Sequence, residues 1–272
     1  MIVFFDIDGT LIGRGRGISP KTLEALERAK AKGHYLIIAS GRTKGNLPEE
    51  IRRFPWDGYL LGSGMYGEFK NQVFLQEEIP LEPLRELLQY ISRRSEIDVV
   101  LENNKGSYLK KAGAVRLREI LLRLGFSTVS QVNEAMQNFI LVEDFEEVTP
   151  VSKLMYFSEG WSYREMITRF QEKFDFYPNS VIQGKDYQNG EIQKKAVTKG
   201  YGVDKFLAYT GFKKTDTVAF GDGFNDIEML QTVNTGVAMR NGVKDLKEVA
   251  DYITESQENE GVYYGLEHLQ LI

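Results

Sequence analysis

The stretch FFDIDGTL, residues 4–11, decides how the rest of this chain is interpreted. Residues 2–5 form a short, continuous apolar run, which is typical of a strand buried on both faces of a parallel sheet. Two carboxylates, Asp6 and Asp8, follow the run directly and are succeeded by a Gly-Thr pair. Such a stretch fits a tight turn, a metal site, or a nucleophile with its acid/base. Taken alone, it leaves all three open.

Strand and helix signals alternate from the first residue onward. Ser19 is a candidate N-cap for a helix that Gly33 ends, and the apolar run 34–40 predicts a second buried strand. A short helix is expected within 44–54, and residues 59–64 end a third strand. This alternation predicts right-handed βαβ units and a parallel sheet, so the fold class is α/β.

The alternation breaks after residue 80 and returns after about residue 186. Between these points the pattern predicts longer and less regular pieces: helices at 81–94 and 162–174, and strand-like runs at 97–104, 153–160 and 181–185. Regular elements then resume: helices at 194–211, 224–233 and 243–251, and strands at 216–222 and 235–239. We therefore expect residues 1–80 and 186–272 to form one domain, with residues 81–185 inserted as a separate α+β domain.

Composition limits the chemistry that the chain can perform. A net charge of -5 argues against nucleic acid or an anionic membrane as a partner. The absence of cysteine excludes thiolate chemistry and fits a reducing cytoplasm, and two histidines make a multi-histidine metal site improbable. The apolar run at the N-terminus is too short for a signal peptide, and no segment reaches the ~18 apolar residues of a membrane helix. A bound metal would be held by oxygen, which favours Mg²⁺.

Polar residues follow three of the predicted strands. The first strand precedes Asp6 and Asp8, the second precedes Ser40-Gly41-Arg42, and a later one leads into GDGFND at 221–226. In open parallel sheets, ligands bind at the carboxyl ends of the strands, so we expect these segments to converge on one site.

The acids of these segments would repel one another if they met. A divalent cation makes such a cluster tolerable, and Mg²⁺ takes a few carboxylates while keeping positions for water and phosphate. Each acidic piece alone also fits a simple turn or a helix cap. The acids concerned are Asp6, Asp8, Asp222 and Asp226.

Two further segments are candidates for phosphate binding. Gly41 lets backbone N–H groups next to Ser40 approach an anion closely. Lys199 lies in a Thr-Lys-Gly setting that is unusual for a helix interior, although most lysines are simply solvated. The run GSGMYG at 62–67 matches a dinucleotide fingerprint, but the alternating residues after it indicate a hairpin instead of the required helix.

These segments resemble, in order, the four motifs of the haloacid dehalogenase (HAD) superfamily, and specifically its Cof-like hydrolases with a C2-type cap. The matching stretches are DIDGT (6–10), SGR (40–42), TKG (198–200) and GDGFND (221–226). The resemblance implies a Rossmann-like HAD core with a parallel sheet, and an inserted C2-type cap domain at 81–185. It also implies a Mg²⁺-dependent phosphatase that acts on small phosphorylated metabolites and forms an aspartyl-phosphate.

The resemblance also implies a role for each matching residue. Asp6 would be the nucleophile, and Asp8 the general acid and then the base. Ser40, Gly41, Lys199 and Asn225 would bind the phosphate. Mg²⁺ would be held by Asp6, the backbone carbonyl of Asp8 and Asp222, with Asp226 supporting the metal or Lys199.

Some residues depart from the family pattern. Arg240 adds a charge near the expected site that the family usually lacks, which leaves substrate preference open. A phosphotransferase or phosphomutase would use the same intermediate and remains an alternative. A non-catalytic binding module is less favoured, because the motif residues are intact. We expect a cytoplasmic monomer or homodimer.

Overall fold

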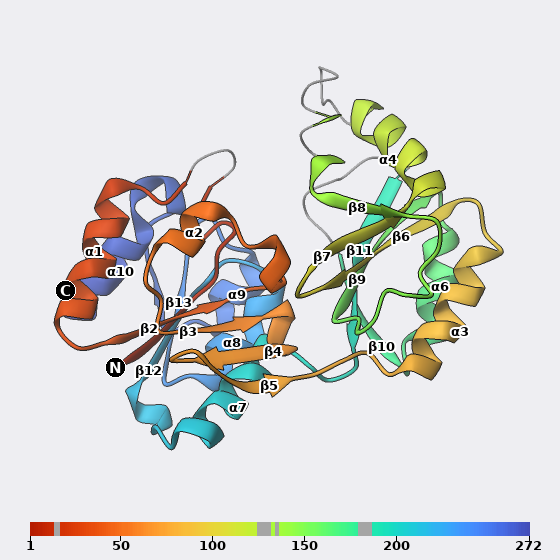
Figure 1. Ribbon diagram of the computed structural model, residues 1–272. Helices are drawn as coiled ribbons and strands as arrows, with labels where there is room; N and C mark the ends of the chain where they lie inside the picture. The colour runs from red at the N-terminus through yellow and green to blue at the C-terminus, as the bar shows by residue number, and fades with distance from the viewer. Residues whose placement is uncertain (14–16, 124–131, 134–135, 179–186) are drawn as a thin grey trace. The chain divides into compact units, whose positions relative to one another are not determined.

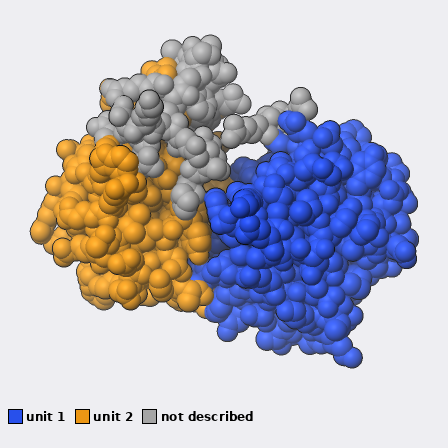
Figure 2. Space-filling model, turned by 180° about the vertical axis from the view of Figure 1, so that it is seen from behind, with its two compact units in different colours: residues 1–42, 47–76, 197–272 blue, residues 43–46, 77–196 orange. Residues whose placement is uncertain are grey.

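The computed structural model describes residues 1–13, 17–123, 132–133, 136–178 and 187–272. The chain divides into two compact units, which are coloured separately in Figure 2. Unit 1 contains residues 1–42, 47–76 and 197–272, and unit 2 contains residues 43–46 and 77–196. Unit 1 is interrupted after Gln76 and resumes at Val197, whereas the sequence predicts these two boundaries at residues 80 and 186. The assignment of core and cap domains stays a prediction.

Unit 1 is built on a sheet of eight described strands in the order β14-β13-β12-β1-β2-β3-β4-β5 (Figure 1). The strands from β14 to β3 pair in parallel, and β4 and β5 are antiparallel to their neighbours. This confirms the predicted α/β fold with a parallel sheet. The bounds are β1 Ile2–Phe5, β2 Tyr35–Ala39, β3 Gly58–Leu61, β4 Tyr66–Phe69, β5 Gln72–Gln76, β12 Thr217–Gly221, β13 Thr235–Ala238 and β14 Tyr252–Ile253.

The central strand β1 is buried on both of its faces. Val3 and Phe5 belong to one apolar cluster, and Ile2 and Phe4 belong to another. The first cluster also contains side chains of α1 (Pro20–Ala31), α2 (Glu49–Arg53) and α10 (Gly261–His268), and the second contains those of α7 (Lys199–Thr210), α8 (Ile227–Thr232) and α9 (Lys244–Val249). Because both faces must be apolar, the sequence of β1 reads as a continuous run.

The helices therefore cover the sheet in two layers (Figure 1). In α1, Ser19 is the N-cap as predicted, and its Oγ accepts the N–H of Thr22 at 3.0 Å. Neither α10 nor α4 of unit 2 is among the predicted helices. The bounds in unit 1 are α1 Pro20–Ala31, α2 Glu49–Arg53, α7 Lys199–Thr210, α8 Ile227–Thr232, α9 Lys244–Val249 and α10 Gly261–His268.

Two details follow from local turn chemistry. The stretch after GSGMYG is a β4–β5 hairpin, as predicted, with Lys70 and Asn71 at positive φ in its turn. The expected helix at 194–211 is wrong at its beginning, because β11 continues to Lys194 and α7 starts only at Lys199. The cause is Thr198, whose Oγ1 accepts the N–H of Tyr201 at 3.2 Å and so caps the helix.

Unit 2 has its own sheet, whose six described strands have the order β10-β11-β9-β6-β7-β8. Its pairs are antiparallel except β7–β8. Helix α4 packs on the sheet through Leu117, Ile120 and Leu121, and the predicted strand at 181–185 lies outside the described residues. The bounds are β6 Ile97–Asn103, β7 Gly106–Lys110, β8 Phe139–Val142, β9 Lys153–Glu159, β10 Phe174–Pro178, β11 Tyr187–Lys194, α3 Leu81–Ser92, α4 Lys111–Arg123 and α6 Ser162–Phe170.

None of the helices in the described part of the chain has the length and apolar character needed to cross a membrane.

Candidate active site

The parallel register of β1 and β12 brings two acidic segments together at the carboxyl edge of the sheet. Phe5 pairs with Phe220, so Asp6 leaves β1 beside Gly221, the last residue of β12, and Asp222 follows that residue. The N–H of Asp6 donates to the carbonyl of Phe220 at 3.0 Å, and Asp6 is only 6% exposed. The backbone of Asp6 is therefore held by the sheet while its carboxylate leaves the strand end.

The turn after β1 packs directly on Asp222. The Thr10 hydroxyl donates to Oδ1 of Asp222 at 3.1 Å. Gly9 has φ +90°, and a Cβ built on it would lie 2.1 Å from Oδ2 of Asp222. Only glycine allows this conformation and this close approach together.

Replacement of Gly9 with Ala is expected to displace the Asp222 carboxylate and to weaken divalent-metal binding by at least about tenfold. Calorimetric titration of Mg²⁺ measures this effect. Gly33→Ala is the matched control, because Gly33 has a similar φ of +83° and a Cβ built on it would meet none of the described atoms within 4 Å. Equal metal affinities in the two variants would contradict the steric argument.

Lys199 joins the acids from the first turn of α7. Its side chain is fully buried, and its Nζ donates to Oδ1 of Asp6 at 2.6 Å and to Oδ1 of Asp226 at 2.5 Å. Gly200 lets α7 approach α8, since a Cβ there would lie 2.8 Å from the carbonyl oxygen of Glu228. The Thr-Lys-Gly setting is thus a helix start with a buried lysine and a close helix contact.

Asp226 uses both of its carboxylate oxygens. Oδ1 accepts from Lys199, and Oδ2 accepts the N–H groups of Asp222 and Gly223, each at 2.9 Å. The side chain is fully buried. Asp226 therefore orients both the lysine and the loop that carries Asp222, while Asn225 lies half-buried in the same turn.

The cluster carries more negative than positive charge. Asp6, Asp222 and Asp226 each offer an oxygen, and these oxygens lie within 4.8 Å of one another. Burial raises the pKa of Asp6 well above its usual range, and Asp226, Asp222 and Asp8 raise it further against the opposing effect of Lys199. Burial, followed by the Asp226 charge, raises the pKa of Asp222 to about 7.

The pKa of the lysine is also raised, but for a different reason. Burial alone would lower the pKa of Lys199, but the charges of Asp226 and Asp6 outweigh it and raise the pKa. Two buried carboxylates and the half-buried Asp222 face one ammonium, so the ionised cluster has two surplus negative charges, which a divalent cation at Asp6 and Asp222 would offset.

The segment after β2 occupies the neighbouring strand end. Ser40 is 1% exposed, its N–H donates to the carbonyl of Leu60 at 2.9 Å, and its carbonyl accepts the N–H of Ser63 at 3.0 Å. Its Oγ accepts the N–H of Arg42 at 3.2 Å, and Gly41 between them is half-buried. The ends of β2 and β3 are thereby tied together.

Asp8 does not join the carboxylate cluster. Its side chain is 54% exposed and forms a two-bond ion pair with Arg42, with Nε to Oδ2 at 2.6 Å and Nη2 to Oδ1 at 2.7 Å. No role for Arg42 was predicted from the sequence. Its position directly after Ser40-Gly41, at the strand edge that also carries Asp8, was the available signal.

Arg240, which departs from the family pattern, pairs on the surface. Its Nη2 lies 2.9 Å from Oε1 of Glu255, and its side chain is 62% exposed. The positive charge of Arg240 is therefore paired with a carboxylate of the same unit.

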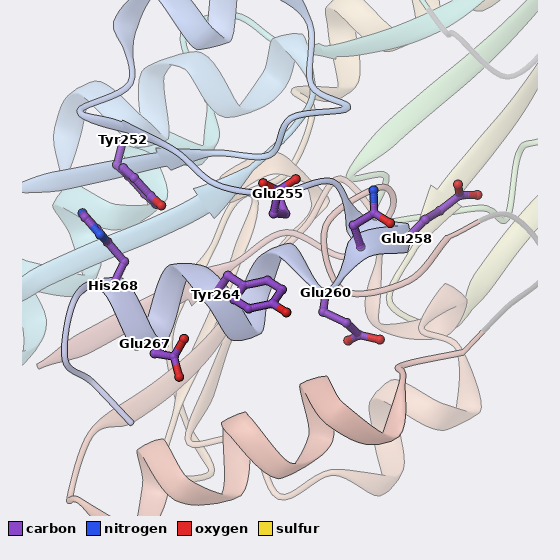
Figure 3. Close-up of a pocket in the computed structure, with 8 residues that line it drawn as sticks. Tyr252, Glu255, Glu258, Glu260, Tyr264, Glu267 and His268 are labelled. Carbon is purple, nitrogen blue, oxygen red and sulfur yellow. The ribbon is translucent and has the colours of Figure 1, made fainter.

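A separate cavity of about 770 Å³ contains none of the catalytic candidates (Figure 3). It is lined by Tyr252, Glu255, Glu258, Asn259, Glu260, Tyr264, Glu267 and His268. Two of these carboxylates accept hydrogen bonds within unit 1: Glu260 from Ser19 and Thr22 at the start of α1, and Glu267 from Tyr263. The polar groups that fit phosphoryl chemistry lie outside this cavity, at the strand ends.

The chain belongs to the haloacid dehalogenase-like hydrolase family, whose model matches residues 3–266. It is 26% identical over 275 residues to YkrA of Bacillus subtilis (strain 168), provisionally named a phosphatase, with 100% of this chain and 98% of that protein covered. The 5-amino-6-(5-phospho-D-ribitylamino)uracil phosphatase YitU of the same organism is 25% identical over 268 residues, with 96% and 94% covered.

A solved structure supports the same relationship. The HAD subclass IIB sugar phosphatase BT4131 superposes with a TM-score of 0.78 at 27% identity, covering 100% of this chain and 99% of that one. The predicted resemblance to the HAD superfamily and the predicted HAD-type enzyme are confirmed by these matches. The roles of the individual site residues remain predictions.

Proposed function

We propose that this chain is a Mg²⁺-dependent phosphatase that hydrolyses small phosphorylated metabolites through an aspartyl-phosphate on Asp6. The observation that carries the proposal is the cluster of buried Asp6, Lys199 and Asp226 with half-buried Asp222 at the carboxyl edge of a parallel sheet. Phosphate monoesters hydrolyse extremely slowly unaided, so an enzyme must offset phosphoryl charge and place a nucleophile in line. This constellation offers both.

In the first step, a carboxylate oxygen of Asp6 attacks phosphorus. The bond from phosphorus to the leaving oxygen breaks as the bond to Asp6 forms. Lys199, held by Asp226, places an ammonium 2.6 Å from Asp6, where it can stabilise phosphoryl oxygens that gain charge. Backbone N–H groups near Ser40 and Gly41, with Asn225, complete the proposed phosphate site.

Asp8 serves both halves of the proposed reaction. It gives its proton to the leaving oxygen, which departs as an alcohol. In the second step the carboxylate of Asp8 takes a proton from water, which attacks phosphorus and breaks its bond to Asp6. Inorganic phosphate is released and both aspartates return to their starting states.

The residues fit Mg²⁺. The donors are hard oxygens, the cluster holds more carboxylates than cationic groups, and burial together with the Asp226 charge raises the pKa of Asp222 to about 7. The carboxylates of Asp6 and Asp222 with the backbone carbonyl of Asp8 would hold the ion, supported by Asp226. When bound, it would supply positive charge to the phosphoryl group and to Asp6.

Metal binding is expected to depend on pH. The raised pKa values of Asp6 and Asp222 mean that the metal-free folded state holds protons that the unfolded state has released. Metal-free stability should therefore fall as pH rises between the ordinary aspartate range and pH 7. Because Mg²⁺ must displace these protons, its affinity should rise up to about tenfold per pH unit for each proton displaced.

Thermal unfolding with and without Mg²⁺ at pH 6 and pH 8 measures this linkage. The stabilisation by Mg²⁺ should be larger at pH 8, and Asp222→Asn should remove most of the difference. A stabilisation that is independent of pH in the unmodified protein would refute the linkage.

The substrate class rests on two relatives. YitU is named for a phosphorylated ribityl compound, and BT4131 is described as a sugar phosphatase. Both descriptions name phosphate esters of polyhydroxylated molecules, so we extend this class to the present chain. A panel of phosphorylated metabolites with Mg²⁺, ranked by kcat/KM for phosphate release, tests it.

The panel also separates the alternatives. Sugar phosphates and related esters should rank highest. No phosphate release from any member would overturn the proposal, whereas a newly phosphorylated acceptor would indicate the phosphotransferase alternative. A cytoplasmic location, the monomer or homodimer, and the role of residues 81–185 as a C2-type cap stay predictions alongside it.

A further inference from the structure

The ion pair between Asp8 and Arg42 belongs to the site, but the proposed reaction gives Arg42 no role. Its two bonds, 2.6 Å from Nε to Oδ2 and 2.7 Å from Nη2 to Oδ1, use the fork of the guanidinium on both carboxylate oxygens. Such two-bond pairs fix the plane of a carboxylate as well as its position. Arg42 therefore fixes the plane and the position of the Asp8 carboxylate.

The backbone that carries Asp8 is already fixed without Arg42. The N–H of Gly9 donates to the carbonyl of Ile12 at 2.8 Å, and Asp8 forms a β-bridge with Ile12. The Asn241 side chain donates to the carbonyl of Gly9 at 2.8 Å. The side chain of Asp8, being 54% exposed, is by contrast in contact with solvent. An aspartate on a rigid turn still has several side-chain rotamers, which an ion pair can restrict.

Arg42 is itself anchored at the strand edge. Its N–H donates to Oγ of Ser40 at 3.2 Å, and its carbonyl accepts the N–H of Gly62 at 2.9 Å. These two bonds connect Arg42 to the segments that follow β2 and β3. The guanidinium is thus presented to Asp8 from a fixed backbone, and the pair spans two neighbouring strand ends of unit 1.

We propose that Arg42 is a positioning residue that holds the Asp8 carboxylate in the orientation required for proton transfer. The proposal rests on the proposed function, in which Asp8 first protonates the leaving oxygen and then takes a proton from water. The two-bond pair is that of the ionised Asp8; when Asp8 carries its proton, one oxygen donates to the leaving group while the other still accepts from Arg42. Alkyl leaving groups, such as those of sugar phosphates, need that protonation, whereas an activated aryl leaving group departs readily without it. Arg42 would thereby give the enzyme its capacity for poor leaving groups.

The test compares Arg42→Ala with the unmodified protein on an activated aryl phosphate and on an alkyl phosphate, both with Mg²⁺. The alkyl phosphate should lose kcat by ~10²–10⁴-fold, the range of general acid–base catalysis. With the aryl phosphate, Asp6 should still be phosphorylated rapidly, so one equivalent of phenol should appear in a burst before slow turnover. KM for the alkyl phosphate should change by less than about threefold, whereas KM for the aryl phosphate should fall, because the phosphorylated enzyme accumulates before the slow second step.

Two further variants keep the test decisive. Arg42→Lys retains the charge but not the fork, and should recover only part of the alkyl-phosphate activity. In an Asp8→Asn background, Arg42→Ala should add less than about threefold, since both changes act on one proton transfer. Arg53→Ala removes an arginine from an exposed pair with Glu49 and is the control for general effects of charge.

Two results would overturn the proposal. A raised KM with unchanged kcat would assign Arg42 to substrate binding, and equal losses on both substrates without a burst would make its role structural. Thermal unfolding of each variant shows whether it is folded. If Arg42→Ala is destabilised, Arg42→Lys and the double variant with Asp8→Asn test the proposal in its place. Phosphate release by the unmodified protein tests the proposed function separately, so the two can fail independently.

Discussion

Asp6→Asn is expected to lower phosphate release from an aryl phosphate by at least ~10⁴-fold, since removal of a covalent nucleophile costs on this order or more. The amide cannot form the phosphoryl bond that the proposed reaction requires. It is also a poorer ligand for Mg²⁺, so both the nucleophile and part of the metal site are lost. Steady-state phosphate release at saturating Mg²⁺ measures the effect.

The same substitution should leave the fold intact. Because burial raises the pKa of Asp6, a neutral side chain relieves charge repulsion in the metal-free protein. Asp226 remains in contact with Lys199 and retains the lysine as an ion pair. We therefore expect metal-free Asp6→Asn to unfold at the same or a higher temperature than the unmodified protein. Full activity in this variant would exclude Asp6 as the nucleophile.

Lys199→Met should have the second-largest effect, on both activity and stability. The ammonium contacts Asp6 and Asp226 and is 0% exposed, so its loss leaves two buried carboxylates without their counter-charge. Breaking a buried pair from one side costs about 3–5 kcal/mol in the free energy of unfolding. The lost phosphate stabilisation should lower kcat by ~10²–10³-fold.

Urea unfolding without Mg²⁺ and kcat with Mg²⁺ separate these two effects. The double variant Lys199→Met/Asp226→Asn should recover part of the stability, because one stranded charge is removed, but none of the activity. Lys153→Met is the matched control: Lys153 is 4% exposed and lies between Glu191 at 2.9 Å and Glu102 at 3.5 Å in unit 2. It should lose stability with a much smaller change in kcat on an aryl phosphate. Equal kcat losses in both lysine variants would refute a phosphate role for Lys199.

Several parts of the fold could be predicted because their signals are local. The run at residues 2–5 is apolar throughout, which requires two buried faces, and the structure places helices over both. Ser19 caps α1, and the Lys70-Asn71 turn joins a hairpin, because both depend on backbone geometry within a few residues. The start of α7 was missed because the capping by Thr198 competed with an apolar pattern that extended further upstream.

The sequence by itself determined that acids follow parallel strands, and therefore that they meet at one edge of the sheet. Strand direction and alternation suffice for this, since the carboxyl ends of parallel strands lie together. Asp6 and Asp222 were predicted in this way, and their proximity is a property of the β1–β12 register.

Only the tertiary structure decided which side chains pair. Lys199 lies 193 residues from Asp6 in the sequence and contacts it at 2.6 Å, while Asp8, two residues from Asp6, turns to Arg42 instead of joining the acidic cluster. The orientation of a side chain depends on the charges and packing that distant segments bring to it. No local pattern contains that information, because burial and ion pairing arise only when the strand ends and the start of α7 have been assembled.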